Sequence, residues 1–539
     1  MILRRCYLLL LPLLLLLASG LGLGCFSETN DDLTIVALLR GVSAATPLAD
    51  LHLYFHGYAA VWSRLYVAFP AVPWYALTLY GLLYVATVLL LAVLDRLLRG
   101  WLPVWPRLAF LLLFFGVAWL EHGFWFNYVR VPLLLAGTGV LFAAQRAPAR
   151  WALLVGLLAF GLAWLIRPSA AVLALLAAAP SAWWLAEKRA LPLLAGALGL
   201  SLVGALFLSL TWSPSATTYR VLDVLKSNLN DYELYHPAPR TPEDTLALAE
   251  MRHWMLGDST LINAPHLQAF LRPDAAYFLT QTAPGKLQLL VQQLGRNYFP
   301  LLLALLAVAY SVGRQRPPGR RVFWLVQLGF LGLVLGLGVG LKLPPRVALP
   351  LLDLWLLSGL VFLLRHPAAP LGHSVRLVLV ALAVSAVPYV FKTWHRRAVL
   401  RQEQQANVAA RRRLLQQAGA ARLLVSDAME ETYKSASPFS DPVFNRPVRL
   451  LSLLGWPTPD PSQSRWRYYL TGTRDFSRAM CRLTRRSDVA WVLTPEGAAL
   501  LNRHVSLRLP AERVPVQWVP AAGFIEAAQP FQLYVAKVK

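Results

Sequence analysis

Acidic residues are scarce in this chain. Among 539 residues there are 27 Asp and Glu against 51 Lys and Arg, and only 14% of the residues are charged. Soluble domains are about a quarter charged, so the composition excludes an ordinary soluble globular protein. The formal net charge of +24 would suggest a nucleic-acid partner in a soluble protein. Here much of it lies in short loops between apolar runs, so we expect membrane topology to explain it, with no nucleic acid as partner.

Cysteines and the common catalytic motifs are also lacking. Cys6, Cys25 and Cys481 are widely separated and form neither a disulfide framework nor a metal knuckle. The chain has no phosphate-binding P-loop, no GxGxxG after a strand, no HExxH and no GxSxG. An ATP-driven pump is therefore not expected.

Long apolar runs are abundant instead. The chain is 57% hydrophobic with a mean hydropathy of +0.51, and 19 Trp and 19 Tyr suit the interfaces of a membrane. We predict an all-α polytopic membrane protein with about 11 transmembrane helices, because spans take about 17–25 residues each. The runs are Tyr7–Gly24, Trp74–Leu94, Arg107–Leu120, Val129–Ala144, Trp151–Ile166, Ala170–Leu185, Leu191–Trp212, Tyr298–Val312, Val322–Leu341, Val347–Leu364 and Leu377–Phe391.

Basic residues occur in every second loop between these runs, as in cytoplasmic loops. This pattern predicts the amino terminus inside and the carboxyl terminus outside. We therefore expect a transmembrane domain over residues 1–392 and an extracytoplasmic soluble domain over residues 393–539. Within the first domain, a first outer loop covers residues 25–73 and a long outer loop covers residues 213–296. The basic residues are Arg4, Arg5, Arg96, Arg99, Arg107, Arg146, Arg150, Lys188, Arg189, Arg314, Arg316, Arg320, Arg321, Arg365 and Arg376.

The carboxyl-terminal segment has the pattern of a small α/β domain. A polar helical stretch over His395–Ala420 opens it. Short apolar runs between Pro and Gly turns then predict strands at Arg422–Ser426, Val489–Leu493 and Phe531–Val538.

An acidic cluster follows the first apolar run. Glu28, Asp31 and Asp32 lie within five residues, at the expected outer surface. One interpretation is a helix cap, because Asn30 or Asp31 precedes an apolar run over Leu33–Leu39. The other is that Asp31 or Asp32 acts as a general base or binds a divalent metal ion. Both interpretations stay open, and they are compatible.

Several basic residues lie at the expected outer ends of the membrane helices, against the general trend. They are Arg130, Arg167, Lys342 and Arg346. Charges beside membrane spans usually face a cavity or a partner, and Arg and Lys suit phosphate recognition. The position of each residue alone is explained equally well by a side chain that extends (snorkels) to the lipid headgroups. Four of them on the face that carries the acidic cluster favour a shared anionic ligand.

Two histidines lie in the same outer loop. Apolar residues at spacings of three and four from Leu48 to Phe69 predict an amphipathic interfacial helix. On that helix His52 and His56 would share one face, which is metal-ligand spacing. Such a pair more often consists of two side chains at the level of the lipid headgroups. A metal site formed by these histidines with Asp31 or Asp32 is therefore the minor hypothesis.

At this point the layout resembles the GT-C superfamily of polytopic membrane glycosyltransferases. The likeness rests on Asn30-Asp31-Asp32-Leu33, on Leu39-Arg40-Gly41 and on Pro73-Trp74-Tyr75, with juxtamembrane helices, a long outer loop and a soluble domain after them. In these features the chain is similar to an uncharacterised bacterial branch of that superfamily, and the likeness covers roughly residues 1–390.

The resemblance implies an enzyme that transfers a sugar from a polyprenyl-phosphate carrier to a glycan, lipid or protein acceptor of the cell envelope. It implies a catalytic carboxylate in the first outer loop, which is Asp31 or Asp32 here, with Glu28 as a third candidate. Arg167, Lys342 and Arg346 would hold the carrier phosphate, with Arg130 and Arg40 as further candidates. The expected location is the bacterial cytoplasmic membrane.

Two other functions remain open. A transporter or flippase of lipid-linked saccharides would need the basic cavity but not the acid. A non-catalytic envelope assembly protein would act through the basic carboxyl-terminal domain, whose positive surface suits anionic glycans or headgroups.

Overall fold

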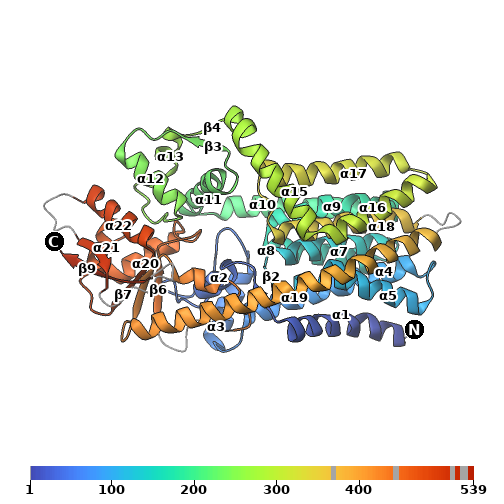
Figure 1. Ribbon diagram of the computed structural model, residues 1–539, viewed down its shortest axis with the longest axis horizontal. Coiled ribbons are helices and arrows are strands. Elements are labelled where there is room, and N and C mark those ends of the chain that lie inside the picture. Colours follow the sequence, from blue (N-terminus) through green and yellow to red (C-terminus); the bar gives the residue numbers. More distant parts are fainter. Residues whose placement is uncertain (1, 366–371, 441–447, 510–515, 522–531, 539) are drawn as a thin grey trace.

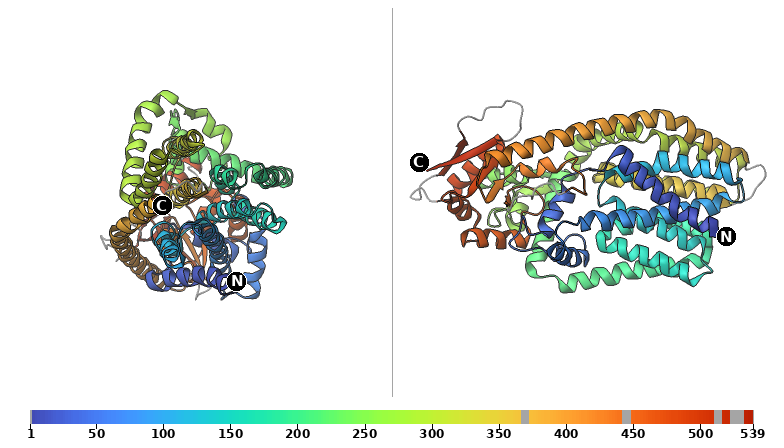
Figure 2. Two further views of the ribbon diagram at one scale, coloured as in Figure 1. Left: turned by 90° about the vertical axis from the view of Figure 1, so that its right-hand side faces the viewer. Right: turned by 90° about the horizontal axis from the view of Figure 1, so that it is seen from below.

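A computed structural model describes residues 2–365, 372–440, 448–509, 516–521 and 532–538. The molecule is elongated, with a bundle of apolar helices and the amino terminus at one end and a sheet with the carboxyl terminus at the other (Figure 1). It is mostly helical, at 72%. Segments 25–73 and 213–296 lie with the sheet at one end of the bundle (Figures 1 and 2).

Apolar helices make up the bundle, and each predicted run coincides with one or more of them. Long apolar side chains favour helices, which also satisfy the backbone hydrogen bonds that a bilayer leaves unpaired. The elements are α1 (Ile2–Leu23), α4 (Trp74–Leu98), α5 (Val104–Phe114), η1 (Phe115–Trp119), α6 (Leu120–Phe124), α7 (Arg130–Gln145), α8 (Arg150–Ile166), α9 (Pro168–Ala186), η2 (Glu187–Ala190), α10 (Leu191–Thr211), α16 (Phe299–Gln315), α17 (Arg320–Leu335), η5 (Gly336–Gly340), α18 (Pro345–Arg365) and the first part of α19 (Gly372–Gln417).

The expected number of spans is not confirmed. Within the described residues, six stretches are long and apolar enough to cross a membrane, or seven if a pair bent by 86° counts as one span. α1, α7 and α8 are shorter apolar helices, and α9, η2 and α10 form one stretch of 44 residues. The apolar helices therefore indicate a membrane protein, and their number as spans depends on how these cases are counted.

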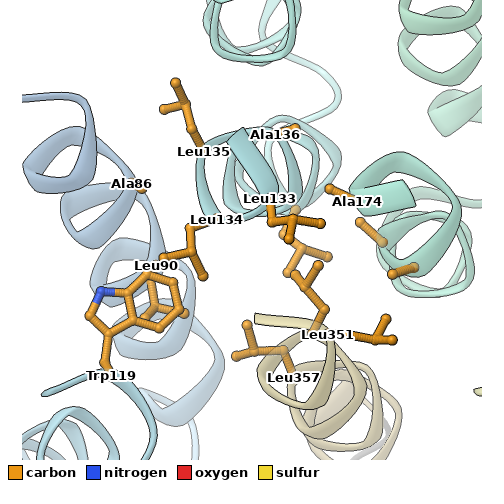
Figure 3. Close-up of a cluster of buried hydrophobic side chains, with 14 of the residues drawn as sticks. Ala86, Leu90, Trp119, Leu133, Leu134, Leu135, Ala136, Ala174, Leu351 and Leu357 are labelled. Carbon is orange, nitrogen blue, oxygen red and sulfur yellow. The ribbon is translucent and has the colours of Figure 1, made fainter. Parts of the chain in front are cut away.

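Helix α7 is the centre of the bundle. Nearly all its side chains are buried, and Leu133 and Leu134 pack among α4, α9 and α18 (Figure 3). Small residues allow this close approach: a Cβ added to Gly139 would lie 2.6 Å from the Cβ of Ala159 on α8. Glycine and alanine serve the same purpose in other membrane helix pairs.

Segment 25–73 begins with a short parallel pair, β1 (Phe26–Ser27) with β2 (Trp125–Phe126). Helix α2 (Asp31–Leu39) follows, and it matches the short helix expected from the apolar run after the acidic cluster. The prediction of an interfacial helix over Leu48–Phe69 is wrong in its first half, because within this range only α3 (Tyr58–Ala68) is helical.

Segment 213–296 folds into short helices. Most begin with a polar cap followed by proline at the first or second helical position, as in the capping box at Thr241 and Asp244. The elements are α11 (Pro214–Lys226), η3 (Ser227–Asp231), β3 (Tyr235–Pro237), α12 (Pro242–Arg252), α13 (Ala264–Phe270), β4 (Leu271–Pro273), α14 (Ala275–Tyr277), η4 (Phe278–Thr282) and α15 (Ala283–Asn297).

Helix α19 joins the bundle to the sheet domain. It has 46 residues and is about 69 Å long at 1.5 Å per residue. The boundary expected at 392/393 falls inside this helix, because the polar stretch from His395 continues the apolar one without a break. The two parts therefore share one continuous helix, which contains Pro388 (Figure 1).

The sheet domain confirms the expected small α/β unit. Its strand order is β6-β5-β7-β9-β8; β5 pairs in parallel with β6 and β7, and β9 pairs antiparallel with β7 and β8. Each of the three expected strands matches one observed, although Phe531 lies outside the described residues. The elements are β5 (Leu423–Ser426), η6 (Met429–Tyr433), β6 (Arg449–Ser452), α20 (Pro461–Thr471), α21 (Phe476–Leu483), β7 (Val489–Leu493), α22 (Pro495–Arg508), β8 (Val516–Pro520) and β9 (Gln532–Val538).

Candidate functional site

A charged pocket lies where the bundle, segments 25–73 and 213–296, and the sheet domain meet. Its volume is about 590 Å³. Charged and aromatic side chains from all four parts line it. They are Asp31, Tyr54, Tyr128, Arg167, Asp223, Lys226, Asp231, Tyr232, Lys342, Arg346, Trp254, Asp427, Glu430, Glu431, Lys434 and Trp456.

The two adjacent aspartates have different surroundings. Asp31 lines the charged pocket and accepts a hydrogen bond from the Thr29 hydroxyl at 3.1 Å. Asp32 is fully buried and accepts from the Tyr75 hydroxyl at 2.8 Å and from the backbone N–H of Tyr128 at 3.2 Å. Successive helical residues point about 100° apart, so only one of the two can face the pocket.

Burial also changes the chemistry of Asp32. It raises the pKa of this carboxyl to about 8, and the Tyr75 hydrogen bond opposes part of the change. Asp32 thus ties α2 to Tyr75 of α4 and to the chain at Tyr128, while Asp31 lines the pocket. Helix capping does not account for the cluster, since Asn30 is the N-cap and makes no side-chain cap bond. Asp31 lies in the first turn of α2, where the helix dipole stabilises an anion.

Glu28 and Arg130 form a buried ion pair next to the pocket and do not line it. The Arg130 guanidinium lies 2.8 Å from Glu28 and 3.6 Å from Glu121. Glu28 in turn accepts from the backbone N–H of Arg346 at 3.2 Å. The pair therefore fixes the start of α18, from which Arg346 enters the pocket.

Three of the expected phosphate-binding residues line the pocket: Arg167, Lys342 and Arg346. Lys342 pairs with Asp231 at 2.8 Å, and Arg346 lies 3.7 Å from Glu28. Arg167 differs, because no ion pair with it occurs in the described part of the chain. Its guanidinium donates to the Tyr128 hydroxyl at 2.8 Å and lies 4.9 Å from the centre of the Tyr54 ring.

Arg40 and the two histidines lie elsewhere. Arg40 follows α2, with its guanidinium 5.7 Å from the centre of the Tyr66 ring, and does not line the pocket. His52 and His56 do not share a helix face, because they lie in an irregular loop where His52 has a φ of +56°. His52 bonds to Asp460 at 2.8 Å, and His56 packs against Trp164. No group of three or more His, Cys, Asp or Glu suited to a metal ion occurs among the described residues.

The sheet domain contributes pocket residues that the sequence did not indicate as site residues. Asp427 follows β5, and Ser452 and Trp456 lie at and after the end of β6. These are carboxyl ends of parallel strands, where ligands bind in open α/β sheets. Asp427 comes directly after the predicted strand Arg422–Ser426, which is a signal that could have identified it.

Asp427 is held in place by the next parallel strand. It accepts from the backbone N–H of Thr494, just after β7, at 2.8 Å. A Cβ at Gly497 would lie 1.7 Å from an Asp427 oxygen, so only glycine permits this approach. His253 of segment 213–296 reaches the same carboxylate at 3.3 Å. The pocket wall is thus a junction between the sheet domain and segment 213–296.

Glu430 of the sheet domain lines the pocket together with Asp31. Burial raises the pKa of Glu430 to about 8, and the charge of Asp31 acts in the same direction. A carboxyl whose pKa is raised in this way keeps its proton at neutral pH. The pocket therefore offers the carboxyl of Asp31, a neutral Glu430 at pH 7, and cations on the side of the bundle.

Comparison of the chain with protein-family models, with curated proteins and with solved structures finds no match. The class of protein is therefore defined by the fold and the pocket. It is a helical membrane protein with a small α/β domain and a charged pocket at their junction.

Proposed function

We propose that this protein is a glycosyltransferase that moves a sugar from a polyprenyl-phosphate donor to an envelope acceptor. The observation that carries the proposal is one pocket that contains Asp31 together with Arg167 and Arg346. A sugar transfer of this kind needs a base for the acceptor hydroxyl and cations for the leaving phosphate. Arg167 is well suited to the phosphate, since it has no ion pair within the described residues.

In the proposed reaction Asp31 takes the proton of the acceptor hydroxyl. The hydroxyl oxygen then forms a bond to the anomeric carbon of the donor sugar, and the bond from that carbon to the phosphate oxygen breaks. The electron pair leaves with the polyprenyl phosphate, whose charge Arg167 and Arg346 stabilise. Lys342 lies on the same side and adds positive potential.

The position of the pocket suits a lipid-linked donor. Arg167 caps α8 and Arg346 lies in the first turn of α18, so the phosphate site adjoins the ends of apolar helices. A polyprenyl chain can remain among the lipids while its phosphate enters the pocket. The proposal includes about 11 spans, with α1, α7 and α8 counted among them and α9 and α10 counted separately, in a bacterial cytoplasmic membrane with the pocket outside.

Purified protein in lipid vesicles with a polyprenyl-phosphate sugar tests the proposal. We expect wild type to transfer or hydrolyse the sugar, and Asp31→Asn to reduce the rate by about 10²–10⁴-fold, the usual contribution of a general base. Asp50→Asn is a matched control, because Asp50 is an exposed carboxylate of the same segment outside the pocket. Full activity of Asp31→Asn would refute the role of Asp31. Saccharide movement across the vesicle without transfer would identify a flippase instead.

A further inference from the structure

A second cavity adjoins the charged pocket. Its volume is also about 590 Å³, within the range of about 300–1,000 Å³ common for ligand pockets. Segment 213–296 builds it, from η3, β3, the end of α12 and the α14–η4 region. Trp254 lines both cavities, so they meet at this side chain.

The chemistry of the second cavity differs from that of the charged pocket. Its lining combines the rings of Tyr235, Trp254 and Tyr277 with the planar polar groups of Asn230, Glu233 and Arg252. Glu233 and Arg252 carry opposite charges, so the cavity is not built for an anion. Aromatic faces cover the C–H faces of sugar rings, and planar polar groups donate to or accept from adjacent hydroxyls.

Two residues of the lining have backbone angles that only glycine adopts readily. Glu233 has a φ of +52° and Trp254 a φ of +60°. Such conformations persist only where the surroundings hold them, and they occur typically at functional sites. Here the Trp254 carbonyl accepts from the backbone N–H of Gly455 at 3.0 Å, and the Asn230 amide donates to the Met251 carbonyl at 2.6 Å.

We propose that the second cavity binds the acceptor, and that the acceptor is a saccharide. This inference rests on the proposed glycosyltransferase function and assigns its acceptor class. The saccharide lies against Tyr277 and Tyr235 and passes Trp254, so that its terminal hydroxyl reaches Asp31 in the charged pocket. The cavity thereby separates acceptor binding from the phosphate site on the bundle.

An array of lipid-free oligosaccharides released from bacterial envelopes tests this on the purified full-length protein. We expect wild type to bind at least one of them, and Tyr277→Ala to weaken that binding by about tenfold through loss of ring contact. Tyr277 is 42% exposed, which favours normal folding of the variant, and Arg252→Gln is a second exposed test. Tyr468→Ala is the matched control, because Tyr468 is 56% exposed and lies outside both cavities.

The outcomes separate this inference from the proposed function. Asp31→Asn should bind the oligosaccharide as wild type does while its transfer rate falls. Binding to wild type without any transfer would support the cavity and refute the glycosyltransferase. Transfer by wild type with an unchanged acceptor KM in Tyr277→Ala and Arg252→Gln would refute the cavity alone. Absence of binding to every oligosaccharide at millimolar concentration would also overturn the inference.

Discussion

At the residue scale, the pocket sets two carboxyls, Asp31 and Glu430, close enough for the charge of Asp31 to act on Glu430. Asp31 comes from a short helix after the first apolar run, and Glu430 comes from the sheet domain about 400 residues later. The pKa of Glu430 is raised to about 8 by burial and by the charge of Asp31. At neutral pH the pocket therefore carries one fewer negative charge than the number of carboxyls that line it. This reduces the electrostatic repulsion of a phosphate.

The pH dependence of transfer tests this pair. Because the pKa of Glu430 is raised in the folded protein, its carboxyl is neutral below about pH 8 and anionic above it. Ionisation adds a charge that repels the donor phosphate, so kcat/KM should fall by about tenfold per pH unit above that value. Glu430→Gln should remove the fall, because the amide stays neutral.

Asp32→Asn provides the control for this measurement. The pKa of Asp32 is also raised to about 8, but its side chain does not line the pocket. The alkaline fall should therefore persist in Asp32→Asn. Loss of the fall in this variant, or its persistence in Glu430→Gln, would contradict the assignment to Glu430.

At the scale of elements, buried polar contacts tie segment 213–296 to the sheet domain. His504 of α22 is fully buried, lies 2.9 Å from the Ser477 hydroxyl of α21, and pairs with Glu250 of α12. Asp258 lies 3.4 Å from the same imidazole. Burial raises the pKa of Glu250, and the His504 contact opposes this. The cluster fixes α12, after which the chain reaches Trp254, between the two cavities.

Removing His504 should loosen this junction. His504→Ala leaves Glu250 buried without its partner, a loss of about 3–5 kcal/mol for a broken buried pair. We expect faster amide hydrogen exchange in α12 and α22, while the apolar bundle stays protected. His395→Ala on the exposed side of α19 is the matched control. Unchanged exchange in α12 would show that other contacts hold the junction.

At the scale of the whole molecule, both cavities lie at one end of the apolar bundle. Segments 25–73 and 213–296 and the sheet domain gather there, and α19 runs from the bundle into the sheet domain (Figures 1 and 2). Helix α19 joins the two parts, and Glu430 and Asp427 of the sheet domain line the same pocket as Asp31. The proposed site therefore depends on residues from both parts of the chain.

Cysteine labelling in a cysteine-free background tests the proposed orientation. Single cysteines at Arg240 and Arg474, both exposed at the sheet end, should react with a membrane-impermeant reagent in intact cells. A cysteine at Arg321, exposed at the start of α17, should react only after the membrane is opened. Labelling at Arg321 in intact cells would reverse the orientation and place the pocket inside.

Local patterns predicted most of the elements. The apolar runs coincide with helices, and β5 and β7 match expected strands within a residue at each end, because hydrophobic spacing and Pro or Gly boundaries act locally. The helix expected from Leu48 does not form where His52 and Phe55 take positive φ values. Contacts with residues distant in sequence impose these backbone angles. One such contact is the backbone N–H of Phe55 donating to the Ile166 carbonyl at 3.0 Å.

The sequence by itself determined that the chain is rich in membrane-type helices, that a small sheet domain follows them, and that Asp31, Arg167, Lys342 and Arg346 belong among the candidate site residues. These conclusions depend on composition, spacing and charge, which are properties of short stretches. Only the tertiary structure separated Asp31 from Asp32, buried Glu28 with Arg130, and brought Glu430 and Trp254 to the pocket. Those facts depend on which distant segments pack together, and burial and hydrogen bonding between such segments decide the chemistry of a carboxyl.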